Sequence, residues 1–356
     1  MKETIHFSDL EPKPIPDFLA AYEIPEAGAL FTFCGATLDD HYFHDHLAMD
    51  YIIGHKPKAL FVWQFGDMVH AGCSNNVKKF FKHLPDSRII HCCNSEEYLN
   101  DIPTEYGDRV SGIVCNHNAT LDRNEFFIIP RSSSGTPLGL RTFDCIYNAR
   151  ICRQKRLHLT YNLDNIIFLT GQSNKTPKAD AGHNRNPQVI KGFNDSYEKL
   201  VSNFRNKDFC IIHKNLSIPK VNRTINDAKV GLCLSKREGA MWSSVEYLLC
   251  GLPIVSTKST GGRDAFFTDK NCIIAEDTPE SVFECVQHWL DNYPTRKRRE
   301  KIREEAIATQ KKHTKALKDK LKEISPSNVD IDAVYKQRYQ HKMHYGTNLR
   351  FKGVFN

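Results

Sequence analysis

The chain has 356 residues, of which 40% are hydrophobic, and its formal net charge is +7. This length exceeds what one compact core usually holds, so we expect two domains. No apolar run approaches the length that spans a bilayer, and the polar opening MKETIHFSDLEPKP lacks the core of a signal peptide. These features argue against a transmembrane or secreted protein, and we expect a cytoplasmic one.

The twelve cysteines raise the question of a disulfide framework or a metal site. No Cys-x-x-Cys pair or ordered Cys/His array occurs, so we expect buried free thiols and no zinc site. The stretch HYFHDHLAMD (41–50) contains three histidines and two aspartates, which suggests either a metal site or a surface helix. Without a second array of ligands we favour the surface helix and expect no metal.

Apolar runs separated by polar, helix-compatible segments recur along the chain. In the amino half they lie at 29–35, 58–66, 87–94, 111–116 and 125–130. The stretch PRSSSGTPLG (130–139) has the composition of a linker, and a second set of runs follows at 145–149, 165–171, 208–213, 230–235 and 252–257. This alternation predicts an α/β protein with two Rossmann-like parallel sheets.

The stretch SKREGAMWSSVEYLLCGLPIVSTKSTGGRD (235–264) contains two glutamates eight positions apart. It follows the predicted strand VGLCLS, and ligands of open α/β sheets bind at the carboxyl ends of strands. Glu238 lies in a turn and Glu246 in a predicted helix from 241 to 250, where each carboxylate could accept hydrogen bonds from sugar or ribose hydroxyls. The alternative is two ordinary helix charges, one favourable to the helix dipole and one paired at the surface.

A basic segment follows the predicted strand at 143–149. Arg150 and Lys155 are spaced so that two cations can converge on a diphosphate. Arg153 and Arg156 crowd the same turn and could take the same role. The alternative is a solvated basic turn.

Together these residues resemble the nucleotide-sugar signature of the retaining GT-B glycosyltransferases of family four, in which Glu, seven residues and Glu precede a G-x-P strand. The resemblance implies that Glu238 contacts the donor sugar, Glu246 holds the ribose, and the Arg and Lys pair neutralises the leaving diphosphate. The backbone around the donor would come from Gly239, Ala240, Met241, Trp242, Gly261 and Gly262.

The same resemblance implies a GT-B architecture of two Rossmann-like domains that face a cleft. We expect an acceptor domain at 1–140, a donor domain at 141–325, and a helical segment at 326–356 that packs back on the amino domain. In the amino domain, Gly35 of CGATLDD follows the first predicted strand. It is either a glycine that lets the backbone approach the donor phosphates or part of a plain turn.

The expected activity is transfer of a sugar, with retention, from a nucleoside diphosphate sugar to a hydroxyl of a glycan or glycolipid, in bacterial-type glycan, lipopolysaccharide or capsule assembly. No cofactor or metal is expected. The basic helix predicted after Pro294 is by default a solvated face, and the alternative is a surface that binds anionic membrane lipid at the inner face as a partner. No nucleic-acid module accompanies the charge, so nucleic acid is not expected. The alternative function is a non-catalytic scaffold at a membrane.

Overall fold

The computed structural model describes residues 19–24, 28–34, 60–64, 81–82, 85, 88–102, 104–130, 141–150, 153–170, 210–214, 216–324, 330–332 and 335. The chain divides into two compact units. The first unit comprises Met1–Asp122 with Thr309–Asn356, and the second comprises Arg123–Ala308. The predicted domain limits of 1–140, 141–325 and 326–356 stay predictions.

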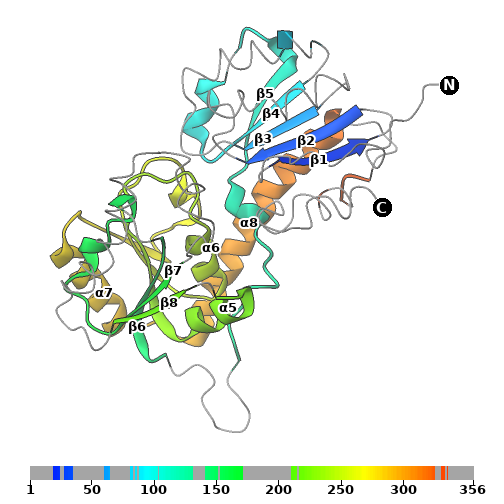
Figure 1. The fold of residues 1–356 in the computed structure, drawn as a ribbon. Coiled ribbons are helices and arrows are strands. Elements are labelled where there is room, and N and C mark those ends of the chain that lie inside the picture. The colour runs from blue at the N-terminus through cyan, green and yellow to red at the C-terminus, as the bar shows by residue number, and fades with distance from the viewer. Residues whose placement is uncertain are drawn as a thin grey trace. The chain divides into compact units, whose positions relative to one another are not determined.

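The first unit contains a five-stranded sheet in the order β1-β2-β3-β4-β5 (Figure 1). Strands β2 to β5 are parallel and coincide with predicted runs, whereas β1 pairs antiparallel with β2 at the edge and was not predicted. The bounds are β1 Leu19–Ile24, β2 Gly28–Cys34, β3 Leu60–Gln64, β4 Arg88–Cys93 and β5 Val110–Val114, with short helices η2 Glu96–Asp101, η3 Gly107–Arg109 and η4 His117–Thr120.

The second unit contains a six-stranded parallel sheet in the order β11-β10-β9-β6-β7-β8. The helices α5 and α6 lie on one side of this sheet and α7 on the other (Figure 1). The strands are β6 Phe143–Asn148, β7 Ile166–Thr170, β8 Cys210–Lys214, β9 Ala228–Cys233, β10 Ile254–Thr257 and β11 Cys272–Ala275. The helices are η5 Arg153–Lys155, η6 Leu157–Thr160, α5 Ile218–Asn226, α6 Trp242–Leu249, η9 Arg263–Phe266 and α7 Pro279–Asp291.

The run EFFIIP (125–130) is not a strand, and the prediction for it was wrong. Its backbone groups bond to the side chains of a helix. Asn222 Oδ1 accepts from Phe127 N at 3.2 Å and Asn226 Oδ1 accepts from Ile129 N at 3.1 Å, while Asn226 Nδ2 donates to Phe127 O at 2.9 Å. Two asparagines one turn apart on α5 thus replace a neighbouring strand, which satisfies the same backbone requirement.

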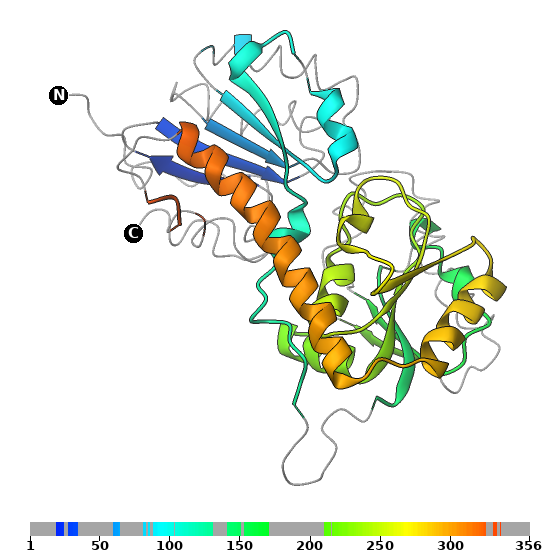
Figure 2. The ribbon, with the colours of Figure 1, turned by 180° about the vertical axis from the view of Figure 1, so that it is seen from behind.

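The long helix α8 (Arg296–Ile324) is one continuous element (Figure 2). Its first part contacts the second unit, where the guanidinium of Arg303 donates to the carbonyl of Arg123 at 2.8 Å and to that of Leu249 at 2.5 Å. Its later part contacts the first unit, where Gln310 Nε2 donates to Leu121 O at 3.0 Å. The buried side chains on α8 include Ile302, Ala306, Leu317 and Leu321.

No helix among the described residues combines the length and the apolar character that crossing a membrane requires. The eight cysteines whose side chains the structure describes are free thiols, and of these eight all except the half-buried Cys285 are buried, as expected.

The contact between His313 and the loop after β5 predicts a pH dependence of stability. His313 Nδ1 accepts a hydrogen bond from Asn116 N at 3.0 Å, which requires a neutral ring, and burial lowers the pKa of His313 to about 4. The unfolded chain binds this proton near pH 6.5 and the folded chain only near pH 4. The free energy of unfolding should therefore fall as the pH drops from 6.5 towards 4, by about 2 kcal/mol between pH 7 and pH 5 from this group.

His313→Asn keeps a side-chain oxygen for Asn116 N and removes the titrating ring. We expect this part of the pH dependence to disappear when denaturant unfolding of the variant and the wild type is compared at pH 7 and pH 5. His91, whose pKa burial lowers to about 3, is present in both proteins and cancels. Equal losses of stability in the two proteins would contradict the prediction.

Candidate active site

The candidate site lies where the strand order of the second unit reverses. From β6 the chain proceeds outward through β7 and β8, whereas β9, on the other side of β6, is followed outward by β10 and β11. Open α/β sheets bind ligands outside the carboxyl ends of the strands at such a switch point. The pairing of β6 with β9 therefore brings the segment that contains Asn148 and Arg150 beside the segment from Ser235 to Glu238.

Glu238 and Lys155 meet in this region, although 83 positions separate them in the sequence. Lys155 Nζ forms an ion pair with Glu238 Oε1, and the two side chains are 7% and 16% exposed. The other carboxylate oxygen, Oε2, is buried and has no hydrogen-bond partner among the described residues. A buried acceptor without a donor costs roughly 1–3 kcal/mol. A ligand hydroxyl would remove that cost.

The two basic residues predicted to bind the diphosphate differ in their surroundings. Lys155 is buried in the ion pair with Glu238. Arg150 is exposed and forms no hydrogen bond or ion pair within the described part of the chain. One cation is thus held in place by the protein, and the other is available to a ligand.

Arg156, considered as a substitute in the diphosphate role, is committed to other partners. Its Nε donates to Leu234 O at 2.6 Å, and its guanidinium also contacts Thr257 Oγ1 and the Asp277 carboxylate. These contacts link the ends of β9 and β10 to the segment after β11. Arg156 therefore has a structural role, while Arg153 lies in η5 beside it.

Glu246 lies in α6 and is only 3% exposed, so it is not a surface helix charge. Its Oε2 accepts from Asn148 Nδ2 at 3.0 Å. Asn148 is itself fixed by α6, because its backbone N donates to the Tyr247 hydroxyl at 2.6 Å and its carbonyl accepts from Ser243 Oγ at 2.9 Å. Asn148 was missed from the sequence, where the only signal is a polar residue that ends an apolar strand.

Tyr247 depends on a glycine of the neighbouring strand. A Cβ added at Gly231 of β9 would lie 2.3 Å from Cδ2 of the Tyr247 ring, so the ring occupies the space that a side chain would need. Burial raises the pKa of Tyr247, which keeps its hydroxyl protonated. The glycine in VGLC thus allows the contact that positions Asn148.

The loops named in the donor-binding prediction border Glu238. Gly239, Ala240 and Met241 lead from it to Trp242, the first residue of α6, and Gly239 and Met241 are buried. Gly261 and Gly262 have φ values of +112° and +94°, which favour glycine, and they precede η9. Gly35 lies outside the described residues. The binding roles of all these residues stay predictions.

Residues 151–309 match the family model of glycosyl transferases group 1. The match begins one residue after Arg150 and includes Lys155, Glu238 and Glu246. None of the curated proteins matches the chain.

Several solved structures are similar to the chain. A trehalose-6-phosphate synthase has a TM-score of 0.53 at 11% identity, with 83% of this chain and 74% of that chain covered. A glycosyltransferase from Rickettsia africae ESF-5 has a TM-score of 0.52 at 14% identity, with 80% and 74% covered. Anabaena Alr3699/HepE in complex with UDP has a TM-score of 0.50 at 13% identity, with 82% and 73% covered.

At these identities the likeness shows the fold alone. Together with the two sheets, it confirms the predicted α/β fold class of GT-B type with Rossmann-like domains. The cleft between the domains and the return of residues 326–356 to the amino domain stay predictions. The segment from residue 151 to residue 309 is thus similar to the glycosyl transferases group 1 family.

Proposed function

We propose that the protein is a retaining glycosyltransferase that moves a hexose-type sugar from a nucleoside diphosphate donor to a hydroxyl of a glycan or glycolipid. The observation that carries the proposal is the buried Oε2 of Glu238, which lies next to the cation of Lys155 and has no hydrogen-bond partner in the described part of the chain. A sugar hydroxyl is a neutral donor that this oxygen can accept, and a diphosphate is the anion that the nearby cations suit. Both chemical groups occur together in a nucleotide sugar.

Each residue has a distinct role in this proposal. Glu246, held by Asn148, accepts hydrogen bonds from the ribose hydroxyls, and Glu238 orients the donor sugar. Arg150 and Lys155 stabilise the charge that develops on the departing diphosphate, so no metal is assigned to that task.

The transfer breaks the bond between the anomeric carbon and the phosphate oxygen, and the electron pair leaves with the diphosphate. The acceptor oxygen bonds to the anomeric carbon on the same face, and its proton goes to the departing diphosphate. Retention, a hexose-type sugar, and a place in bacterial-type glycan, lipopolysaccharide or capsule assembly are supported by the resemblance of the Glu238 and Glu246 spacing to family four. The neighbour solved with UDP supports a nucleoside diphosphate donor.

Replacing Glu246 tests the nucleotide end of the site. Glu246→Gln removes a charged acceptor and presents an amide to the Asn148 amide. A hydrogen bond to a charged group contributes about 1.5–3 kcal/mol, so UDP or GDP should bind roughly 10–100-fold more weakly, as measured by calorimetry. The control is Glu284→Gln on the exposed side of α7, which should bind like the wild type. The proposal fails if the wild type binds neither nucleotide, or if Glu246→Gln binds as well as the wild type.

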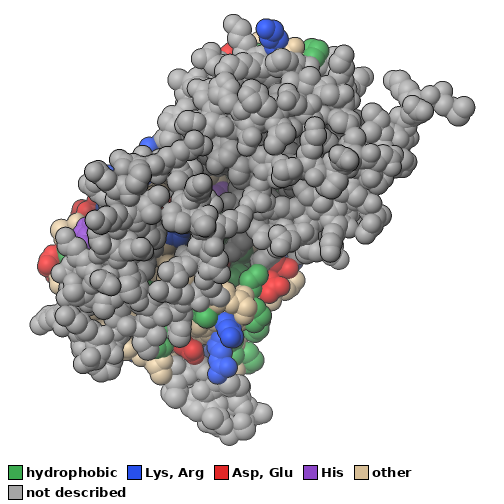
Figure 3. All heavy atoms as spheres, in the orientation of Figure 1, with side chains coloured by type: hydrophobic (Ala, Val, Ile, Leu, Met, Phe, Trp, Pro, Cys, Tyr) green, Lys and Arg blue, Asp and Glu red, His purple; other side chains and the backbone are tan. Residues whose placement is uncertain are grey.

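A second proposal, peripheral association with an anionic membrane, is favoured by the start of α8. The exposed residues Lys297, Arg298 and Lys301 lie there, beside Arg296, which is paired with Glu300, although cations at a helix amino end oppose the helix dipole. Cations at this unfavourable end of a helix are expected where a negatively charged binding partner compensates their repulsion from the dipole. The start of α8 differs from the face drawn in Figure 3, where the coloured side chains are a mixture of hydrophobic, basic and acidic groups. The basic start of α8 is therefore the surface that we assign to lipid, either for the enzyme or for a non-catalytic scaffold.

Sedimentation with phosphatidylglycerol vesicles tests this assignment. We expect the protein to pellet at low salt and to be released as ionic strength rises. Lys297→Gln with Lys301→Gln removes two exposed cations one helical turn apart and should weaken binding by about 1 kcal/mol for each. Lys315→Gln is the control, because Lys315 is paired with Asp319 farther along the same helix. Absence of pelleting by the wild type, or equal loss in the control, would contradict the assignment.

A further inference from the structure

Arg263 carries a completely buried guanidinium at the edge of the candidate site. It is the first residue of η9, directly after the glycine pair, and its exposed fraction is 0%. A buried charge is tolerated only when it is paired and hydrogen-bonded. Its partners within the protein determine whether it is free to bind a ligand.

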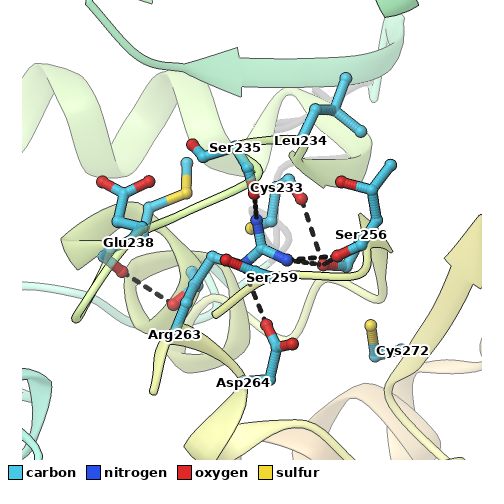
Figure 4. A network of polar contacts seen from close by, with 12 residues as sticks. Cys233, Leu234, Ser235, Glu238, Ser256, Ser259, Arg263, Asp264 and Cys272 are labelled. Carbon is cyan, nitrogen blue, oxygen red and sulfur yellow. Dashed lines mark hydrogen bonds and ion pairs between the residues drawn. The ribbon is translucent and has the colours of Figure 1, made fainter. Parts of the chain in front are cut away.

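The partners of Arg263 are almost all protein carbonyls and hydroxyls (Figure 4). Nε donates to Asp264 Oδ1 at 2.9 Å, and one terminal nitrogen donates to Ser235 O at 2.5 Å. The other terminal nitrogen donates to Ser256 Oγ at 2.7 Å and to the carbonyl of Thr257. Four of the five guanidinium N–H groups are thus used within the protein. Arg263 is therefore not a phosphate ligand, although it is a cation in a site suited to phosphate.

These contacts join the two loops that follow neighbouring strands. Ser235 lies just beyond the end of β9, and Ser256 and Thr257 are the last residues of β10. A planar fork with several donors can hold acceptors on both strands at once, which a lysine with a single nitrogen cannot reproduce. The guanidinium of Arg263 therefore fixes the separation of the β9 and β10 loops.

Glu238 is held in the same arrangement through its backbone. Its N–H donates to Thr260 O at 2.9 Å, and its carbonyl accepts from the backbone N–H of Arg263 at 3.2 Å. Thr260 N also donates to Lys236 O at 3.2 Å, so the loop after β10 runs alongside the loop after β9 as a short parallel bridge. Figure 4 shows that Glu238 and Arg263 meet through the backbone, while the carboxylate of Glu238 points away from the guanidinium.

We propose that Arg263 is a positioning residue that sets the carboxylate of Glu238 for the donor sugar. This inference rests on the proposed function and assigns the sugar end of the donor to the link between Arg263 and Glu238. The nucleotide end is anchored separately, because Glu246 is held by Asn148 and α6 without any contact to Arg263. Loss of the guanidinium fork should therefore affect recognition and transfer of the sugar more than binding of the nucleotide.

The test compares Arg263→Lys with the wild type on UDP, GDP, UDP-glucose, UDP-N-acetylglucosamine and GDP-mannose. We expect the Kd of the bare nucleoside diphosphate to stay within about threefold of the wild-type value. The additional affinity contributed by the sugar should be lost, and kcat should fall roughly 10–100-fold, since a displacement of about 1 Å can cost 100-fold in rate. Lys270→Gln, at an exposed lysine in the turn before β11, is the matched control and should behave like the wild type.

Ser256→Ala covers the case in which Arg263→Lys does not fold. It removes one acceptor of the guanidinium but keeps the carbonyl of Thr257, so it should give a smaller loss of the same kind. The inference is overturned if either variant folds, gains as much affinity from the sugar as the wild type does, and keeps the wild-type kcat. It is also overturned if binding of the bare nucleotide and of the nucleotide sugar fall by the same factor, as a merely structural role requires. A wild type that binds no nucleotide sugar would instead defeat the proposed function.

Discussion

The parallel pairing of β6 with β9 is the constraint on which the site depends. Its register places Ile146 opposite Gly231, so the carboxyl ends of both strands reach the same edge of the sheet. Gly231 also leaves room for the ring of Tyr247, whose hydroxyl accepts from the backbone of Asn148. One strand register thus determines both which segments meet and how the amide of Asn148 is presented to Glu246. A shift by one residue would turn every side chain of the strand to the other face.

The site concentrates buried polar groups that stability alone would not favour. Arg263 is wholly buried, and the ion pair of Lys155 with Glu238 is mostly buried. Taking such charges out of water costs several kcal/mol for each ion before partners compensate it. The partners are fixed backbone carbonyls and neighbouring side chains, which cannot rearrange freely when a ligand arrives. Surroundings fixed in this way hold the carboxylate of Glu238 in place before a ligand arrives.

The sequence was sufficient for the features that depend on local pattern. Apolar runs between turn residues predicted β2 to β10 and the helix from Trp242 to Leu249, because a strand buried on both faces needs a continuous apolar run. The same rule failed at 125–130, where the asparagines of α5, rather than a neighbouring strand, bond to the backbone. It also missed β1, an edge strand that pairs antiparallel with β2.

The site was predictable in part for the same reason. Glu238, Glu246 and Lys155 stand out by spacing, and the structure places Lys155 and Glu238 in contact. Asn148 and Arg263 do not stand out, because their importance comes from partners that are distant in the sequence. Asn148 meets Glu246 across 98 positions, and Arg263 meets Ser235 across 28. Such pairings depend on strand order, which periodicity does not encode.

The two glutamates are supported by different parts of the second unit, and this separation has a consequence for specificity. Glu246 is held by the first turns of α6 and the end of β6, whereas Glu238 is held by the loop after β10 and by Lys155. Contacts that do not share partners make nearly additive contributions to free energy. Under the proposed function, changes in the loop after β10 would therefore alter the sugar that is accepted without loss of the nucleotide. Under the proposed function, the ribose and the sugar of the donor are therefore recognised by different segments of one domain.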